Sequence, residues 1–257
     1  MPVRTERHDH ACVITIDRPQ VRNAVDGPTA RDLEAAVDAA EADDAVRVLV
    51  LTGADGTFCA GADLKALASG DASRLLRLQR TLDGPLGPTR RAPTKPVIAA
   101  IEGHAVAGGF ELALWADLRV VAEDAHFGFL ERRWGVPLID GGTVRLARMV
   151  GVSRASDLVL TGRTIGASEA AEMGIANRVC APGTALEMAL LLAAELAAFP
   201  QACMRADLAG VRAAHDGQID EMLLLEHDRG VASLETGEML EGLAAFVGGA
   251  GRGGRAR

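Results

Sequence analysis

Residues 96–115, with the sequence PVIAAIEGHAVAGGFELALW, decide the fold class of this chain. The first seven are almost all apolar, a pattern typical of a strand that is buried on both faces of a sheet. Glycines follow this strand, and the apolar run 109–115 then predicts a helix. A buried strand, a glycine-bearing turn and a helix in direct succession indicate an α/β fold with a largely parallel sheet.

The residues before this stretch predict a β-α-β start. Short β-branched runs at 11–17 and 46–52 predict two strands. Between them Asp26 has the position of a helix N-cap, with a proline in the first turn and apolar residues at helical spacing behind it. A further helical stretch is expected at 72–91.

The residues after it predict a second, mostly helical part. We expect an α/β core of repeated ββα-like units over residues 1–195 and a helical C-terminal region over residues 196–257. Further strands are predicted at 118–122 and 126–129, and helices at 143–149, 153–160, 168–173, 184–198, 201–214, 219–234 and 238–246.

Composition indicates a folded protein without a large anionic partner. The 257 residues are 49% hydrophobic, which is ample for a core. Their 27 basic and 35 acidic residues give a net charge of −8, which argues against broad nucleic-acid or anionic-membrane surfaces. The apolar stretches are shorter than the roughly 20 residues that a membrane-spanning helix needs. We therefore expect neither a nucleic-acid nor a membrane partner.

The N-terminus and the cysteines predict a cytoplasmic protein. Residues 1–10 are polar and carry both signs of charge, unlike a secretory signal or a transit peptide. Cys12, Cys59, Cys180 and Cys203 are widely separated, with no spacing suited to zinc. Reduced thiols and no metal site are the expectation.

Two glycine-bearing segments, at 57–65 and 102–113, each follow a predicted strand. Glycines at such turns let the backbone approach a ligand closely and leave N–H groups unpaired at the start of the next helix. Two N–H groups of this kind would form an oxyanion hole. Close packing of the backbone is the alternative explanation for either segment alone. Dinucleotide, P-loop and nucleophile-elbow motifs are absent from the sequence.

Two glutamates are candidates for acid–base chemistry. Glu111 falls in the first turn of the predicted 109–115 helix among apolar residues, and the alternative is a capping-box glutamate. Glu131 precedes two arginines, so its alternative is a surface ion pair. A pocket holding one protonated and one ionised carboxyl would suit the addition of water to a double bond. Local sequence does not show that the two glutamates meet.

Taken in order, these segments resemble the enoyl-CoA hydratase/isomerase (crotonase) superfamily over nearly the whole chain. The resemblance rests on family motifs that recur with family-like spacing. They are Arg22-Asn-Ala24, Phe58-Cys-Ala-Gly-Ala-Asp63, the 95–112 segment, Phe127-Gly-Phe-Leu-Glu131, Gly141-Gly-Thr-Val-Arg-Leu146 and the 160–165 segment.

The resemblance implies a crotonase-like spiral of repeated ββα units, with the helical C-terminal region used to form a homotrimer or a dimer of trimers. It implies an oxyanion hole from the amides of Ala62 and Gly108. It also implies that Glu111 activates water and that Glu131 protonates the α-carbon. The implied reaction adds water to a trans-2-enoyl-CoA to give a 3-hydroxyacyl-CoA, as in fatty-acid metabolism.

No metal or redox cofactor is implied by the resemblance, and coenzyme A enters as part of the substrate. The substrate-binding residues that it implies are Arg22, Ala60, Asp63, Leu64 and Lys65. Among these, Arg22 and Lys65 are candidates for the coenzyme A phosphates, with a solvated surface charge as the alternative for each.

The chain departs from the family pattern at residues 135–143, where the proline is displaced and Asp140 appears. Asp140 is interpreted either as an N-cap or as a third carboxylate near the acyl site, so we include it among the substrate-binding candidates. For Trp115 and Trp134 we expect core packing rather than a pocket role. The alternatives to a hydratase are an enoyl-CoA or dienoyl-CoA isomerase on the same scaffold and a CoA-binding protein without turnover.

Overall fold

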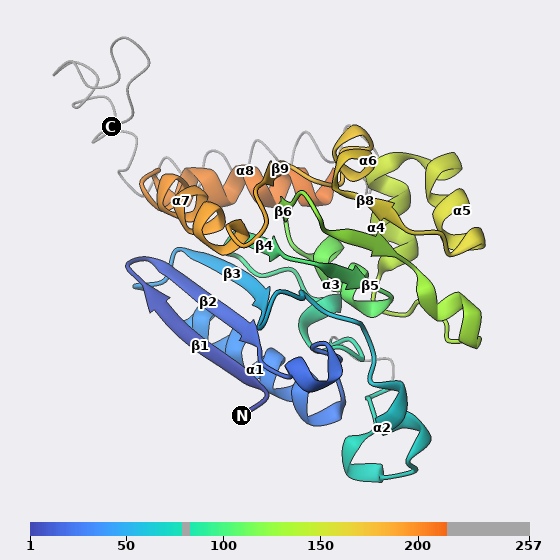
Figure 1. Ribbon diagram of the computed structural model, residues 1–257. Helices are drawn as coiled ribbons and strands as arrows, with labels where there is room; N and C mark the ends of the chain where they lie inside the picture. Colours follow the sequence, from blue (N-terminus) through green and yellow to red (C-terminus); the bar gives the residue numbers. More distant parts are fainter. Residues whose placement is uncertain (79–82, 215–257) are drawn as a thin grey trace, which may run out of the picture.

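The computed structural model describes residues 1–78 and 83–214. Two sheets organise this part of the chain (Figure 1). The larger sheet has the strand order β1-β2-β3-β4-β6-β9, and all neighbours in it are parallel except the antiparallel pair β1 and β2. Its strands are β1 Val3–His8, β2 Ala11–Ile16, β3 Val48–Gly53, β4 Val97–Ile101, β6 Leu118–Ala122 and β9 Arg178–Cys180.

The smaller sheet has the order β5-β7-β8, with β5 and β7 parallel and β7 and β8 antiparallel. Its strands are β5 His104–Val106, β7 His126–Gly128 and β8 Ile165–Gly166. The described helices are α1 Gly27–Ala42, α2 Leu64–Ala68, α3 Gly108–Trp115, α4 Gly142–Val150, α5 Val152–Thr161, α6 Ala167–Glu172, α7 Ala185–Ala197 and α8 Gln201–Ala213, and the 3-10 turns are η1 Pro19–Val21, η2 Ala72–Arg74, η3 Pro88–Arg90 and η4 Leu130–Trp134.

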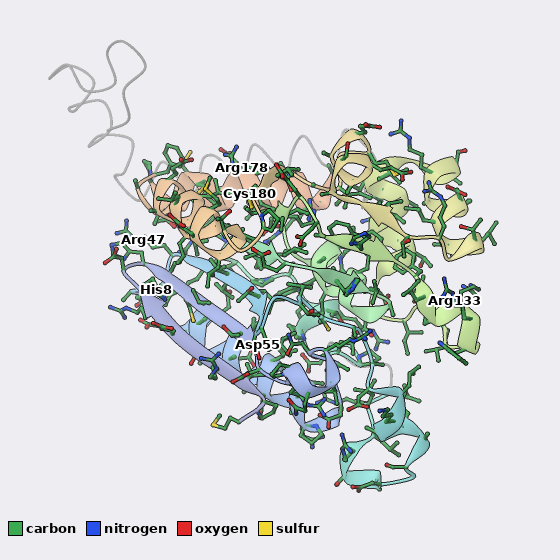
Figure 2. All side chains as sticks on the ribbon, in the orientation of Figure 1. His8, Arg47, Asp55, Arg133, Arg178 and Cys180 are labelled. Carbon is green, nitrogen blue, oxygen red and sulfur yellow. The ribbon has the colours of Figure 1, made fainter. Side chains whose placement is uncertain are left out.

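The inner strands of the larger sheet, β2, β3, β4 and β6, are buried on both faces, which explains why their sequences are mostly apolar. Because side chains alternate along a strand, Val48 and Val50 of β3 belong to the cluster with α7, whereas Leu49 and Leu51 belong to the main core with α1 and α3. Arg47 directly precedes β3, lies near His8 (Figure 2) and donates a hydrogen bond to the Ala197 carbonyl at the end of α7 (2.7 Å). The strands predicted from the sequence are confirmed as β2, β3, β4, β6 and β7.

A strand, a short crossing segment and a helix recur along the chain. The succession β4, β5, α3 is the fullest example. In the two earlier turns of the chain the crossing segment is reduced to a single bridge: before α1, Val25 pairs with Ala62, and before α2, Cys59 pairs with Ala105. The predicted spiral of repeated ββα units is confirmed, and its bridges align the segments that form the site.

The sequence prediction of a helix at residues 72–91 is wrong. The described residues of this stretch contain only the short turns η2 and η3. Gly84, Pro85, Gly87 and Pro88 interrupt any helical hydrogen-bond ladder there, and Gly87 has a φ of +95°.

Strands β1, β5, β8 and β9 were also not predicted, because their short or polar sequences carry no clear period. The helices expected at 219–234 and 238–246 lie outside the described residues, so the boundary near residue 195 and the function of the region 196–257 stay predictions.

Within the described residues, no single helix has the length and apolar character needed to cross a membrane. Only α7 and α8 taken together, with a bend of 112° between them, meet that test. Asp117 connects α8 to the core, because Arg212 of α8 donates hydrogen bonds to both of its carboxylate oxygens (2.8 and 2.6 Å).

Candidate active site

A cavity of about 450 Å³ lies where the segments after β3, β4 and β7 meet. Its walls are mostly apolar side chains from residues 60–67, 76–78, 85–86, 106–108 and 130–139. Among the described residues that line it, only Glu111, Glu131 and Asp140 are ionisable. The site is therefore an apolar pocket with three converging carboxyl groups, a form typical of small-molecule sites.

The amide of Ala62 is presented to this cavity by the backbone around it. The bridge with Val25 uses the neighbouring residues, because the Val25 N–H donates to the Gly61 carbonyl (2.8 Å) and the Asp63 N–H donates to the Val25 carbonyl (2.9 Å). In a parallel bridge the Ala62 N–H then points to the other side. It donates no hydrogen bond within the described residues.

The amide of Gly108 lies next to it, at the start of α3, where the first N–H groups have no partner inside the helix. A Cβ built on Gly61 would come within 2.6 Å of the Gly108 nitrogen, and one built on Gly108 would lie 3.6 Å from the Ala62 nitrogen. The Gly108 N–H also makes no hydrogen bond to any described residue. Two unpaired amides side by side in an apolar cavity suit a developing oxyanion.

Glu111 is held in place by backbone donors. Its side chain is buried, and its Oε1 accepts hydrogen bonds from the amides of Asp140 (2.9 Å) and Gly142 (2.8 Å). Burial raises the pKa of Glu111 to about 7, with further contributions from the charges of Asp140 and Glu131, against the opposing effect of the two amides. Glu111 is thus an oriented acceptor rather than the capping-box residue considered from sequence.

Glu131 lies in η4 and is equally buried, at 5% exposed. Neither of its carboxyl oxygens has a hydrogen-bond partner among the described residues. Burial raises the pKa of Glu131, and the Arg132 charge opposes this shift. The alternative of a surface ion pair is therefore wrong, and a carboxyl group without donors inside an apolar wall favours its neutral, proton-bearing form.

Comparison with known proteins identifies the family to which this chain belongs. The family model described as enoyl-CoA hydratase/isomerase matches residues 6–249. The chain belongs to the enoyl-CoA hydratase/isomerase family. An enoyl-CoA hydratase crystal structure from Mycobacterium tuberculosis superposes on it with a TM-score of 0.89 and 38% identity, covering 96% of this chain and 95% of that one.

Two curated relatives agree with the family assignment. A probable enoyl-CoA hydratase of Rhizobium meliloti is 38% identical over 91% of this chain and 90% of its own length. The enoyl-CoA hydratase EchA19 of Mycobacterium tuberculosis is 41% identical over a shorter region, which spans 62% of this chain and 60% of that protein.

The hydratase/isomerase site brings together most of the residues expected from sequence. Ala60, Ala62, Leu64 and Gly108 line the cavity, together with the three carboxyl groups. Arg22 and Lys65 do not line it. Both are exposed, and each adjoins the 60–64 wall: the Arg22 carbonyl accepts from the Ala60 amide (3.1 Å), and Lys65 follows Leu64 in α2.

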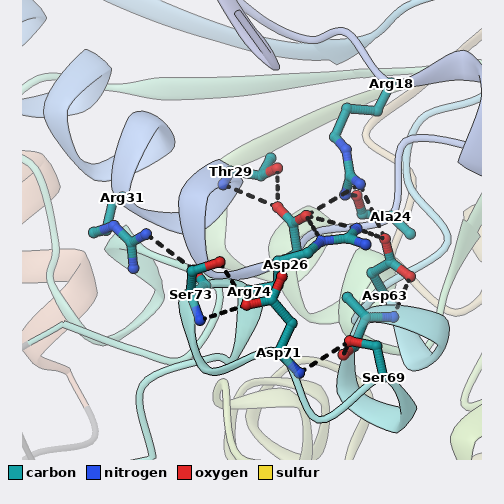
Figure 3. A network of polar contacts seen from close by, with 11 residues as sticks. Arg18, Ala24, Asp26, Thr29, Arg31, Asp63, Ser69, Asp71, Ser73 and Arg74 are labelled. Carbon is teal, nitrogen blue, oxygen red and sulfur yellow. Dashed lines mark hydrogen bonds and ion pairs between the residues drawn. The ribbon is translucent and has the colours of Figure 1, made fainter.

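Asp63 has a structural role instead of a place in the cavity lining (Figure 3). One oxygen accepts from the Ala66 amide (3.0 Å) and caps α2. The other accepts from the buried Arg18 (3.0 Å) and from the half-exposed Arg74 (3.1 Å). Both oxygens are thus occupied by protein donors, and the same two arginines also bind Asp26, the N-cap of α1.

Asp140 is not the N-cap of the following helix, because that position belongs to Gly141. Its Oδ1 accepts from the Leu86 amide (3.0 Å) and from the Thr89 hydroxyl. The expectation for Trp134 is also wrong: it is 71% exposed and lines the cavity, whereas Trp115 packs in the core as predicted and donates to the Arg91 carbonyl (2.7 Å).

Sequence reasoning missed the residues that hold the carboxyl groups. Thr89 lies in a segment without a motif of its own, since the prediction made residues 72–91 helical. Arg145 belongs to the quoted 141–146 motif, but no function was predicted for it. Gly142 belongs to a quoted motif, and its function is steric: a Cβ there would come within 2.8 Å of the Glu111 Cγ. The motif was the available signal, but only the fold shows which side chain needs that space.

Ala107 is strained beside the oxyanion hole. It has φ 53° and ψ −129°, a backbone conformation that favours glycine. We predict that Ala107→Gly raises the free energy of unfolding by about 1 kcal/mol, because relief of roughly 1–3 kcal/mol of strain exceeds the added freedom of the unfolded chain. Urea denaturation measures it, with Ala105→Gly in β5 as the destabilising control. An Ala107→Gly variant less stable than wild type contradicts the strain.

Proposed function

We propose that this chain is an enoyl-CoA hydratase that adds water to a trans-2-enoyl-CoA and forms a 3-hydroxyacyl-CoA. One observation carries the proposal: two buried carboxyl groups share an apolar cavity with the adjacent amides of Ala62 and Gly108. Within residues 1–78 and 83–214, one carboxyl group has backbone donors, the other has none, and both amides are unpaired. Membership in the enoyl-CoA hydratase/isomerase family makes an acyl-CoA thioester the substrate class.

The thioester oxygen accepts hydrogen bonds from the Ala62 and Gly108 amides. Addition of water at the β-carbon moves negative charge onto this oxygen as an enolate forms. Fixed amides in a cavity without competing water stabilise that charge, and each donor of this kind contributes about 3 kcal/mol in other enzymes.

The environments of the two glutamates separate their functions. Glu111 accepts two N–H donors at one oxygen, so its ionised form is oriented to take a proton from water as the oxygen–carbon bond forms. Glu131 accepts no hydrogen bond from any described residue, and its place in an apolar wall favours the neutral form, which gives a proton to the α-carbon. One proton is taken and one is given, and the thioester is left intact.

The coenzyme A part of the substrate extends from the cavity past residues 60–64. Arg22 and Lys65 supply exposed positive charges on that side for the phosphates. The reaction is redox-neutral. Its proton transfers are assigned to the two glutamates, and the negative charge of the enolate oxygen is stabilised by the two amides. We therefore propose that it proceeds without a metal or redox cofactor.

We also propose a cytoplasmic homotrimer or dimer of trimers. Large apolar side chains on the described surface, including Val152 (74% exposed), Leu160 (74%) and Val211 (72%), support association. The reduced thiols of the buried Cys12 and Cys59 support a reducing compartment. Light scattering coupled to gel filtration tests the assembly, and a monomer in solution contradicts it.

The experiment for the proposed activity follows the loss of enoyl absorbance with crotonyl-CoA and longer trans-2-enoyl-CoAs. In oxygen-18 water the product should carry the label at its β-hydroxyl. Glu111→Gln keeps an oxygen that accepts from Asp140 and Gly142 but cannot take a proton, so it should lose hydration while still binding a saturated acyl-CoA. Wild-type protein that hydrates no enoyl-CoA overturns the proposal.

An isomerase is the second candidate, because a third carboxyl group, Asp140, lines the same cavity. An isomerase moves a proton between carbons and incorporates no water. A 3-enoyl-CoA substrate separates the two functions: conversion to the 2-enoyl isomer without oxygen-18 incorporation supports the isomerase, and no conversion supports the hydratase alone.

A further inference from the structure

Asp140 connects parts of the site that are far apart in the sequence. Its side chain is 3% exposed, and its Oδ1 accepts from the Leu86 amide (3.0 Å) and from the Thr89 hydroxyl, which are buried in the 84–89 turn. Its backbone N–H donates to the Glu111 Oε1 (2.9 Å). One residue thus contacts the turn through its side chain and a carboxyl group of the proposed chemistry through its main chain.

The 84–89 turn in turn supports the oxyanion hole. Leu86 is 1% exposed, and its Cδ1 fills the space where a Cβ on Gly108 would stand. The Leu86 side chain is therefore the wall against which the Gly108 backbone rests. A shift of this turn would move the surroundings of an amide that the proposed function assigns to the thioester oxygen.

Arg145 makes a second link between the same two segments. Its Nη1 donates to the Asp140 carbonyl (2.8 Å), and its Nη2 donates to the Thr89 carbonyl. The packing leaves little freedom, since a Cβ on Gly84 would come within 2.5 Å of the Asp140 Oδ1. The Asp140 contact is thus part of a closed connection between α3, the 84–89 turn and the start of α4.

We infer that Asp140 is a positioning residue that fixes the Glu111 carboxyl group and the Gly108 amide relative to each other by holding the 84–89 turn. This inference rests on the proposed function for its catalytic consequence, although the structural connection does not depend on it. Asp140 itself gives and takes no proton in the hydration.

The charge of Asp140 should affect the pH dependence of activity, which an uncharged structural residue would leave unchanged. The ionisable groups that face Glu111 are Asp140 and Arg145 near the start of α4 and Glu131 in η4, and Arg90 in η3 acts on Asp140 in turn. Asp140 raises the pKa of Glu111, after the larger effect of burial. Because Glu111 must be ionised to accept a proton, removing this charge extends activity to lower pH.

The test compares Asp140→Asn with Asp140→Ala. Asparagine keeps an oxygen for Leu86 and Thr89, so it should retain most of kcat and move the acidic limb of the kcat/KM profile to lower pH. Alanine releases the turn and should lower kcat roughly 10- to 100-fold with little change in KM, since a displacement of about 1 Å costs up to about 100-fold. Asp124→Asn, an exposed carboxylate outside the cavity, is the matched control.

Hydrogen exchange of the Leu86 amide tests the connection without relying on turnover. Its protection should survive in Asp140→Asn and fall roughly tenfold in Asp140→Ala, as expected for one lost hydrogen bond. Thr89→Val removes one hydrogen-bond donor and keeps the Asp140 carboxylate. It tests the same connection if Asp140→Ala does not fold. It should reduce both protection and kcat in the same direction.

Three outcomes overturn the inference: unchanged Leu86 protection in a folded Asp140→Ala, lost protection with unchanged kcat, or an Asp140→Asn profile identical to that of wild type. If wild-type protein hydrates no enoyl-CoA, the proposed function fails instead. The exchange data and the Glu111 pKa, measured by carbon-13 NMR in wild type and Asp140→Asn, then decide the positioning role.

Discussion

Replacing Glu131 with glutamine should lower kcat for enoyl-CoA hydration by about two to four orders of magnitude, the range typical of a lost general acid. Glutamine has nearly the same shape but carries no transferable proton. Because neither Glu131 oxygen has a protein partner in the described residues, the substitution breaks no hydrogen bond of the fold. Stopped-flow or steady-state loss of enoyl absorbance gives the rate.

Binding separates this chemical effect from a damaged pocket. Glu131→Gln should bind a saturated acyl-CoA as wild type does, measured by calorimetry. The double variant with Glu111→Gln should lose little more than either single one, because two groups that act in the same step are not additive. A Glu131→Gln enzyme with kcat close to wild type would remove Glu131 from the mechanism.

The pH dependence of the rate tests which glutamate is the base and which is the acid. Glu111 must be ionised, so activity should fall as the pH drops through its pKa of about 7. Glu131 must be protonated, so activity should also fall at high pH, where Glu131 loses its proton. In Glu131→Gln the residual rate should lose the alkaline limb and keep the acidic one.

Replacing Arg18 with methionine should reduce the free energy of unfolding by about 3–5 kcal/mol, the cost of removing one partner from a buried ion pair. The Arg18 guanidinium lies 3.2 Å from Asp26 and 3.0 Å from Asp63, and all three side chains are at most 10% exposed (Figure 3). Without it, two carboxylates would face each other, with only the half-exposed Arg74 between them and solvent. Urea denaturation measures the loss.

Two variants test whether uncompensated charge is the cause. Arg74→Met should reduce the free energy of unfolding much less than Arg18→Met does, because the Arg74 side chain is 37% exposed and its ion pairs are solvated. The triple variant Arg18→Met, Asp26→Asn, Asp63→Asn removes the charges and keeps the helix caps, since asparagine caps as well as aspartate. It should recover stability relative to Arg18→Met, and a further loss would contradict the explanation.

At low pH the free energy of unfolding of Arg18→Met should come closer to that of wild type. Burial alone would raise the pKa of Asp26, but hydrogen bonds from Thr29 and Arg74 and the charge of Arg18 together hold it below its ordinary value. A lowered pKa stabilises the fold above the unfolded pKa of about 3.9 and ceases to do so as the pH falls through the folded value. The deficit of Arg18→Met should therefore be largest near neutral pH.

The sequence by itself determined the inner strands of the larger sheet, most of the described helices and the glycine-bearing turns of the site. Buried strands such as 97–101 are nearly continuous apolar runs, and the glycines after them leave amides free at helix starts, so both features are local and visible in the residue pattern. The two glycine-bearing segments were therefore visible in the residues, and the family resemblance implied the amides of Ala62 and Gly108 within them. The resemblance also paired Glu111 with Glu131, whose meeting no local pattern shows.

Tertiary structure alone decided the environment of each carboxyl group. Glu131 is followed by two arginines and is nevertheless buried, with no hydrogen-bond partner among the described residues. Asp140 holds Leu86 and Thr89 from more than fifty residues away. The turn that contains Leu86 and Thr89 was predicted as a helix. Local sequence carries no information about a hydrogen bond to a carboxylate from a distant segment. Burial and long-range hydrogen bonds set the charge states of this site, and both exist only once the chain has folded.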